Sequence, residues 1–150
     1  MTDAVEMGRP RHAPEENTMK ILIVEDDFVA RRMLKEILNP YGDCDVVVDG
    51  EEAVQAFRMA LADGTPYDLI CMDIMMPNVD GNESLKRIRA VEAEHNIRGS
   101  AEAKALMISA LDDPKTVVRA FYDGGATAYI IKPIQKEKVL AEIRSFGLIP

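Results

Sequence analysis

Residues 68–81 read DLICMDIMMPNVDG, and this stretch holds the strongest signals of the fold. Its apolar run, residues 69–72, is short and shows no alternation of polar and apolar side chains, which is typical of a strand buried on both faces. Asp73 follows this run directly, and the Asp80-Gly81 pair is a turn signal that precedes a helical pattern. The stretch therefore predicts a buried parallel strand that ends in an acid and continues through a loop into a helix.

The same unit recurs along the rest of the chain. Four further apolar runs of strand length lie at residues 21–24, 44–48, 106–108 and 128–131. Apolar residues at helical spacing follow the five runs: Val29, Met33, Leu34, Ile37, Leu38; Ala53, Val54, Phe57, Ala60, Leu61; Leu85, Ile88, Val91; Val117, Val118, Phe121; and Val139, Leu140, Ile143. Strands and helices that alternate through connections too long for hairpins indicate parallel βαβ units. We expect an α/β fold, a doubly wound five-stranded parallel sheet flanked by five helices.

The length of 150 residues leaves room for one domain. Residues 1–18 contain two prolines and no hydrophobic periodicity, so we expect a flexible N-terminal tail. The folded domain is expected to span residues 19–147, and the chain after Pro133 has room for one helix but for no output domain. The polar connector at 92–103 is expected to be an extended helix end plus a loop, and no function is assigned to it.

Composition excludes several classes of protein. The formal charge of −8 argues against nucleic-acid binding, which usually depends on clustered Lys and Arg. The sequence contains no apolar run long enough for membrane insertion and no secretory signal at its start. Cys44 and Cys71 lie in apolar runs, which favours buried reduced thiols in a cytoplasmic protein.

Chemically active residues follow the predicted strands at their carboxyl ends, where doubly wound sheets bind ligands. They are Glu25, Asp26 and Asp27 after the first strand, Asp73 after the third, Ser109 after the fourth and Lys132-Pro133 after the fifth. Each is a weak signal alone, and Asp27 fits an N-cap of the following helix. Together the carboxylates indicate a divalent-cation site of the kind that Mg²⁺ favours, with an ammonium and a hydroxyl beside it. That combination balances the charge of a phosphoryl group.

Four segments closely resemble the response regulator receiver family of two-component systems: ILIVEDD at 21–27, DLICMDIMMPNVDG at 68–81, LMISA at 106–110 and GGATAYIIKPI at 124–134. The resemblance covers residues 19–146 and implies a flavodoxin-like sheet with strand order 2-1-3-4-5. It implies a single-domain, chemotaxis-regulator-like switch rather than an enzyme, since the protein would catalyse only its own phosphoryl transfer and slow autodephosphorylation.

The resemblance also implies a role for each acid. Asp73 would be the phosphoacceptor and would form an acyl phosphate. Asp26 would bind Mg²⁺ (or Mn²⁺) directly and Glu25 through water, although a shift of one residue would bring Asp27 into the set. The main-chain carbonyl of Met75 would be a further metal ligand.

The remaining site residues take their roles from the same resemblance. Ser109 would hydrogen-bond the phosphoryl group, and Ala110 would keep the approach open. Lys132 would pair with the carboxylate and then with the phosphoryl group, aimed by a cis peptide bond before Pro133. Tyr129 resembles the family's switch aromatic, which turns inward when Ser109 moves.

Met75 and Leu111 occupy the two positions that tune dephosphorylation in this family. Both are apolar and cannot orient a water molecule, so the resemblance implies an acyl phosphate that lasts hours rather than seconds. The phosphodonor would be a histidine kinase or a histidine phosphotransfer protein. The signal would leave to a downstream protein at the face formed by the fourth helix, fifth strand and fifth helix, and a phosphorylation-dependent homodimer stays open.

Three alternatives remain to be distinguished. A haloacid-dehalogenase-type, Mg²⁺-dependent aspartyl phosphatase also uses an Asp at a strand end, but it needs a second acid where this chain has Met75. A flavodoxin-like cofactor module would require a hydroxyl-rich loop in place of the acids at 25–27, which would repel the FMN phosphate. A degenerate receiver would act only as a docking module.

Overall fold

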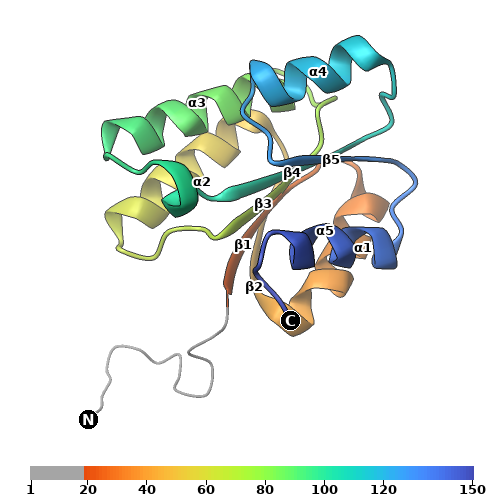
Figure 1. Cartoon of the computed structure of the whole chain (residues 1–150), viewed down its shortest axis with the longest axis horizontal. Helices are drawn as coiled ribbons and strands as arrows, with labels where there is room; N and C mark the ends of the chain where they lie inside the picture. Colours follow the sequence, from red (N-terminus) through yellow and green to blue (C-terminus); the bar gives the residue numbers. More distant parts are fainter. Residues whose placement is uncertain (1–18) are drawn as a thin grey trace.

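The computed structural model describes residues 19–150, so the predicted tail at 1–18 lies outside the described residues. Strands and helices alternate along this part of the chain (Figure 1). The strands are β1 (Met19–Val24), β2 (Gly42–Val47), β3 (Leu69–Met72), β4 (Lys104–Ser109) and β5 (Ala128–Ile131). The α-helices are α1 (Phe28–Leu38), α2 (Gly50–Ala62), α3 (Gly81–Glu94), α4 (Pro114–Tyr122) and α5 (Lys136–Ser145), and the short 3₁₀ turns are η2 (Asn39–Tyr41) and η3 (Gly99–Ala101).

All five strands pair in parallel, in the order β2-β1-β3-β4-β5, which confirms the expected sheet. In Figure 1, α1 and α5 lie on one side of the sheet, and α2, α3 and α4 lie on the other. The register pairs Val24 of β1 with Met72 of β3, so both strands end at the same level. The residues that follow these strands are therefore neighbours at the carboxyl edge.

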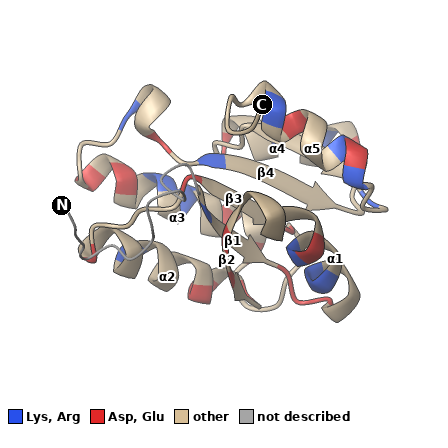
Figure 2. Cartoon of the chain, turned by 90° about the horizontal axis from the view of Figure 1, so that it is seen from below, with Lys and Arg blue, Asp and Glu red and all other residues tan. Residues whose placement is uncertain are grey.

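Two hydrophobic cores fill the space between the sheet and its helices. Alternate residues of each central strand face opposite sides, so Ile21 and Ile23 join the core under α1 and α5, whereas Leu22 and Val24 join the core under α2 and α3. Figure 2 shows charged residues gathered on helices and loops, while the central strands carry almost none. Within residues 19–150, no helix combines the length and the apolar character needed to cross a membrane.

The edge strand β2 differs from the prediction. It runs from Gly42 to Val47 rather than from 44 to 48, and its Asp43 and Asp45 side chains are exposed. The Asp45 carboxylate accepts a 2.7 Å hydrogen bond from the Tyr67 hydroxyl. Only one neighbouring strand pairs with β2, so acids are tolerated there although β2 lies beside β1, which is buried except at Lys20.

Two helices expose apolar residues that the periodicity assigned to the core. In α1, Val29 and Met33 face solvent, and the helix packs through Ala30, Leu34, Ile37 and Leu38 instead. In α4, Val118 and Phe121 are exposed, and Ala120 is the buried residue. The faces of α2, α3 and α5 match the expectation more closely, with Phe57, Ile88 and Ile143 in the core.

The connector at 92–103 is anchored by a buried ion pair. Helix α3 continues to Glu94, and the carboxylate of Glu92, which is almost fully buried, lies 2.8 Å from Arg89 Nη1. Glu92 Oε2 also accepts a 2.8 Å hydrogen bond from the Ala103 amide, and Arg89 donates to the Gly125 carbonyl. These contacts join α3 to the segments that lead into β4 and β5.

Aspartates cap four of the five helices that begin above the carboxyl edge of the sheet. The carboxylate of Asp27 accepts from the Ala30 amide at 2.8 Å, which confirms the predicted N-cap of α1. Asp49, Asp80 and Asp113 cap α2, α3 and α4 in the same way. Much of the negative charge at this edge therefore belongs to helix termini.

Candidate functional site

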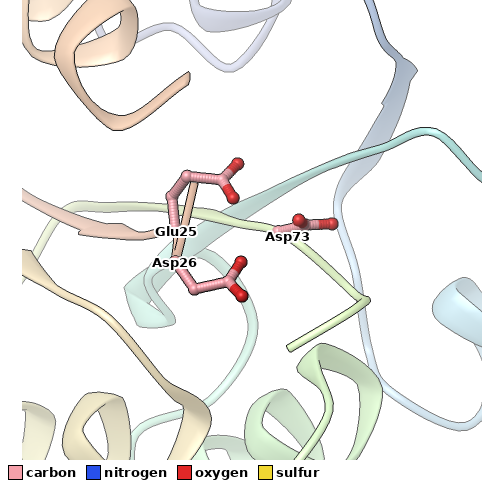
Figure 3. Close-up of side chains that lie close together, drawn as sticks. All are labelled: Glu25, Asp26 and Asp73. Atoms are coloured by element: carbon pink, nitrogen blue, oxygen red, sulfur yellow. The ribbon is translucent and has the colours of Figure 1, made fainter. Parts of the chain in front are cut away.

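Three carboxylates converge at the carboxyl edge of the sheet. Glu25 and Asp26 follow β1, and Asp73 follows β3, whose main chain is held to β1 by a 3.0 Å hydrogen bond from the Asp73 amide to the Val24 carbonyl. One oxygen from each acid lies within 4.8 Å of the others, and Figure 3 shows the side chains of Glu25 and Asp26 extending toward Asp73. Glu25 and Asp73 are buried, whereas Asp26 is exposed, so the cluster opens to solvent on one side.

Lys132 inserts its ammonium group between two of these acids. Its Nζ lies 3.0 Å from Glu25 Oε1 and 3.2 Å from Asp73 Oδ2. The residue follows β5, and its amide donates a 2.8 Å hydrogen bond to the Ser109 carbonyl of β4. The Lys132–Pro133 peptide bond is cis, as the sequence resemblance implied.

The electrostatics of the cluster reflect burial as well as charge. Burial raises the pKa of Glu25 to about 7, because the ammonium of Lys132 offsets only part of the desolvation and the charge of Asp73 adds to it. Burial lowers the pKa of Lys132, but Glu25 and Asp73 outweigh it, and its pKa is raised overall. The cluster thus contains three acids and one ammonium group, so its net charge is negative.

The donor set fits a hard divalent cation. Three carboxylates supply oxygen ligands, and the exposed side of Asp26 leaves room for water, which Mg²⁺ usually retains in protein sites. The cluster contains no thiolate or imidazole, which zinc favours. Met75 lies beside it, and its amide donates a 3.2 Å hydrogen bond to Asp73 Oδ1.

Ser109 ends β4 at the same edge and is fully buried. Its hydroxyl oxygen accepts a hydrogen bond from the Leu111 amide at 3.3 Å, and Ala110 between them is exposed. The hydroxyl is therefore tied to the first residues of the β4–α4 loop.

Tyr129 of β5 holds the same loop from the other side. Its hydroxyl donates a 2.7 Å hydrogen bond to the Leu111 carbonyl, and its ring is half-buried. Burial raises the pKa of Tyr129, so the phenol stays neutral and able to donate. The structure thus brings Ser109, Leu111 and Tyr129 into one hydrogen-bonded unit next to the acids.

Arg31 was not singled out by the sequence, yet its guanidinium contacts the acidic segment. Arg31 Nη1 donates to the main-chain carbonyls of Glu25 at 3.1 Å and of Asp26 at 3.3 Å. One signal was available, since a cation near the start of a helix opposes the helix dipole and calls for another explanation. Its carbonyl partners could not be read from spacing.

Comparison with known proteins agrees with this geometry. The model of the response regulator receiver domain matches residues 21–144. The chemotaxis protein CheY of Treponema pallidum is 34% identical over 148 residues, which cover 97% of this chain and 92% of the relative. The chemotaxis protein CheY of Bacillus subtilis is 36% identical over 124 residues, which cover 83% of this chain and 93% of the relative.

A solved structure is similar along most of the described chain. It is the CheX–CheY complex of Borrelia burgdorferi with BeF₃ and Mg²⁺, which superposes with a TM-score of 0.73 at 30% sequence identity. The match covers 86% of this chain and 89% of the solved one. This chain, with its sheet order β2-β1-β3-β4-β5 and its acidic carboxyl edge, is therefore similar in both sequence and fold to a protein of known structure.

Proposed function

The chain belongs to the response regulator receiver domain family, whose members are phosphoacceptor switches, and on this premise we propose that Asp73 accepts the phosphoryl group. The observation that carries the proposal is the position of its carboxylate. Asp73 Oδ2 lies 3.2 Å from Lys132 Nζ, and the same side chain meets Glu25 and Asp26 at the end of a central strand. Nucleophile, cation site and ammonium are thereby held together.

In the proposed transfer, a carboxylate oxygen of Asp73 attacks the phosphorus of a phosphohistidine. The new phosphorus–oxygen bond is that of an acyl phosphate, and the phosphorus–nitrogen bond breaks. The departing imidazole keeps the electron pair of that bond. Catalysis then rests on positioning and neutralisation of charge rather than on a separate base.

Mg²⁺ (or Mn²⁺) would be held by Glu25, Asp26 and Asp73, with the main-chain carbonyl of Met75 as a further ligand. When bound, the cation supplies positive charge that reduces repulsion between the acids and the phosphoryl oxygens. Support comes from the three converging carboxylates, whose combined negative charge exceeds the positive charge of the Lys132 ammonium group.

Lys132 and Ser109 are proposed to contact the phosphoryl group. Lys132 already touches Asp73, so its ammonium can follow the charge from the carboxylate to the new phosphoryl oxygens. Ser109 offers a hydroxyl at the same edge, and the small Ala110 leaves space beside it. Pro133 would orient Lys132 from the end of β5.

The output is proposed to pass through Tyr129 and the β4–α4 loop. Leu111 is hydrogen-bonded to both the Ser109 hydroxyl and the Tyr129 phenol. A shift of Ser109 would therefore move the β4–α4 loop and the Tyr129 ring. The α4–β5–α5 face exposes three apolar side chains that a protein partner could cover: Val118, Phe121 and Ile131. That partner is either a downstream protein or a second copy of this chain in a phosphorylation-dependent dimer.

The phosphodonor is proposed to be a histidine kinase or a histidine phosphotransfer protein. Receiver domains work with histidine kinases, and this chain is 30% identical to a segment that makes up 12% of a probable histidine kinase of Oryza sativa. Such donors present phosphohistidine in the cytoplasm, where we place this protein. The acidic charge of −8 supports a protein partner rather than a nucleic acid.

The decisive experiment is incubation with acetyl phosphate and Mg²⁺, followed by intact-protein mass spectrometry. The proposal expects the mass of one phosphoryl group on the wild type and none on Asp73→Asn. Without Mg²⁺ or with Lys132→Ala, the yield should fall sharply. A wild-type mass that stays unchanged would contradict the proposal and favour a docking module, while steady release of inorganic phosphate from many substrates would favour a phosphatase.

A further inference from the structure

Arg31 connects helix α1 to the segment that carries two of the acids. It lies four residues after the N-cap Asp27, and its Nη1 donates to two consecutive carbonyls, those of Glu25 and Asp26. The side chain is half-buried. It therefore spans from the helix back to the end of β1.

Arg31 has no acidic partner in the first turn of its own helix. A cation near a helix N-terminus is unfavourable. The Asp27 cap, not Arg31, satisfies the Ala30 amide. The polar contacts of the Arg31 guanidinium are therefore with the two carbonyls at the end of β1 and not with an acid of α1.

The two bonds restrict the peptide units next to the carboxylates. Each peptide unit is planar, so a fixed carbonyl direction limits the rotation of the neighbouring backbone. The Cα–Cβ bonds of Glu25 and Asp26 then have fewer orientations available. The Phe28 ring lies 5.5 Å from the Arg31 guanidinium carbon and packs over the same group.

We propose that Arg31 is a positioning residue that holds Glu25 and Asp26 in the orientation needed to bind a divalent cation. The inference rests on the proposed function, since it assumes that these acids bind Mg²⁺. Arg31 touches neither the cation nor the phosphoryl group in this scheme. Arg31 would lower the free energy needed to orient the two carboxylates before the cation binds.

The test is a titration of the protein with Mg²⁺ alone, followed by NMR shifts of the amides of residues 25, 26 and 73. Arg31→Ala should bind Mg²⁺ about five- to tenfold more weakly, which corresponds to the loss of one or two modest hydrogen bonds. Arg31→Lys, which keeps one donor group, should recover part of the affinity. Arg32→Ala is the matched control, because Arg32 is exposed and pairs only with Glu36 at 3.2 Å among the described residues.

Thermal unfolding without metal separates positioning from general stability. If Arg31→Ala lowers the melting temperature but binds Mg²⁺ as tightly as the wild type, Arg31 is a structural residue and the inference is overturned. If Arg31→Ala fails to fold, Arg31→Lys provides the same comparison. A wild type that binds no Mg²⁺ would overturn the proposed function as well, whereas tight binding by both proteins would overturn this inference alone.

Discussion

The Tyr129 hydroxyl donates a 2.7 Å hydrogen bond to the main-chain carbonyl of Leu111, and so ties β5 to the loop that follows Ser109. Tyr129→Phe removes this donor and keeps the ring. We expect the free energy of unfolding to fall by about 1 kcal/mol, the usual net value of one such bond. Urea denaturation measures it, and NMR should show shifts in the amides of 110–113. Phosphorylation by acetyl phosphate should persist, and its complete loss would mean that the phenol acts on Asp73 itself.

Met75 and Leu111 lie two residues beyond Asp73 and Ser109, respectively, and both have apolar side chains. Met75 is 59% exposed and Leu111 is half-buried, and neither can orient an attacking water. The double change Met75→Asn and Leu111→Glu should shorten the lifetime of the acyl phosphate about tenfold or more, because it adds groups that can position water. Loss of phosphate from the isolated phosphoprotein measures the lifetime. Met75→Leu with Leu111→Met is the apolar control, and equal lifetimes in all three proteins would refute the explanation.

Gly81 begins α3 against the main chain of Asp73. A Cβ at this position would collide with the Asp73 carbonyl oxygen and press on Ile74 Cα. Gly81→Ala should therefore destabilise the fold by about 2–3 kcal/mol and reduce phosphorylation, because the backbone that carries the proposed acceptor Asp73 must shift. Denaturation and phosphorylation yield are measured together. Lys86→Ala, an exposed site on the same helix, should alter neither, and an unaffected Gly81→Ala would show that the loop yields freely.

The Glu92 carboxylate is buried with Arg89 as its charged partner. Glu92→Ala should cost about 3 kcal/mol of stability, because it leaves the charge of the Arg89 guanidinium without its anionic partner and the Ala103 amide without its acceptor. Glu92→Gln keeps an acceptor and should cost less. Urea denaturation distinguishes them. Acetyl phosphate labelling of the folded fraction should be the same in both variants, since the pair lies away from the acids.

Cys44 provides a test of local burial through its pH dependence. Burial raises its pKa to about 11 from an ordinary 9.0, so the folded protein releases the thiol proton later than the unfolded chain does. The stability contribution is complete below pH 9 and is lost as the pH rises toward 11. Alkylation at pH 8 should be about a hundredfold slower than for a free thiol, because the thiolate reacts. Cys44→Ser identifies the reacting residue, and alkylation as fast as in a peptide would contradict the assignment.

Much of the fold could be predicted because strand burial has a local signature. Uninterrupted apolar runs marked the central strands, and Asp27 marked a helix start. Strand ends then located Glu25, Asp73 and Lys132, since parallel strands present their carboxyl ends at one edge. Their roles came from resemblance to a family, and they stay proposals.

Other features depend on how elements dock, which no single segment encodes. Val29 and Met33 have the spacing of core residues, but α1 packs with a rotated face and leaves them exposed. The Glu92–Ala103 contact spans a connector that looked featureless. Arg31 contacts the carbonyls of Glu25 and Asp26 only when α1 is placed against the end of β1.

The aspartates that begin α1, α2, α3 and α4 have an effect beyond their own helices. Together with the exposed Asp26 they add negative charge to the edge of the sheet that carries the proposed acceptor Asp73, so a small anionic phosphodonor would approach against that charge. A protein donor with lysines and arginines around its phosphohistidine would be attracted by the same charge. If Asp73 accepts a phosphoryl group as proposed, helix capping therefore favours macromolecular over low-molecular-weight phosphodonors.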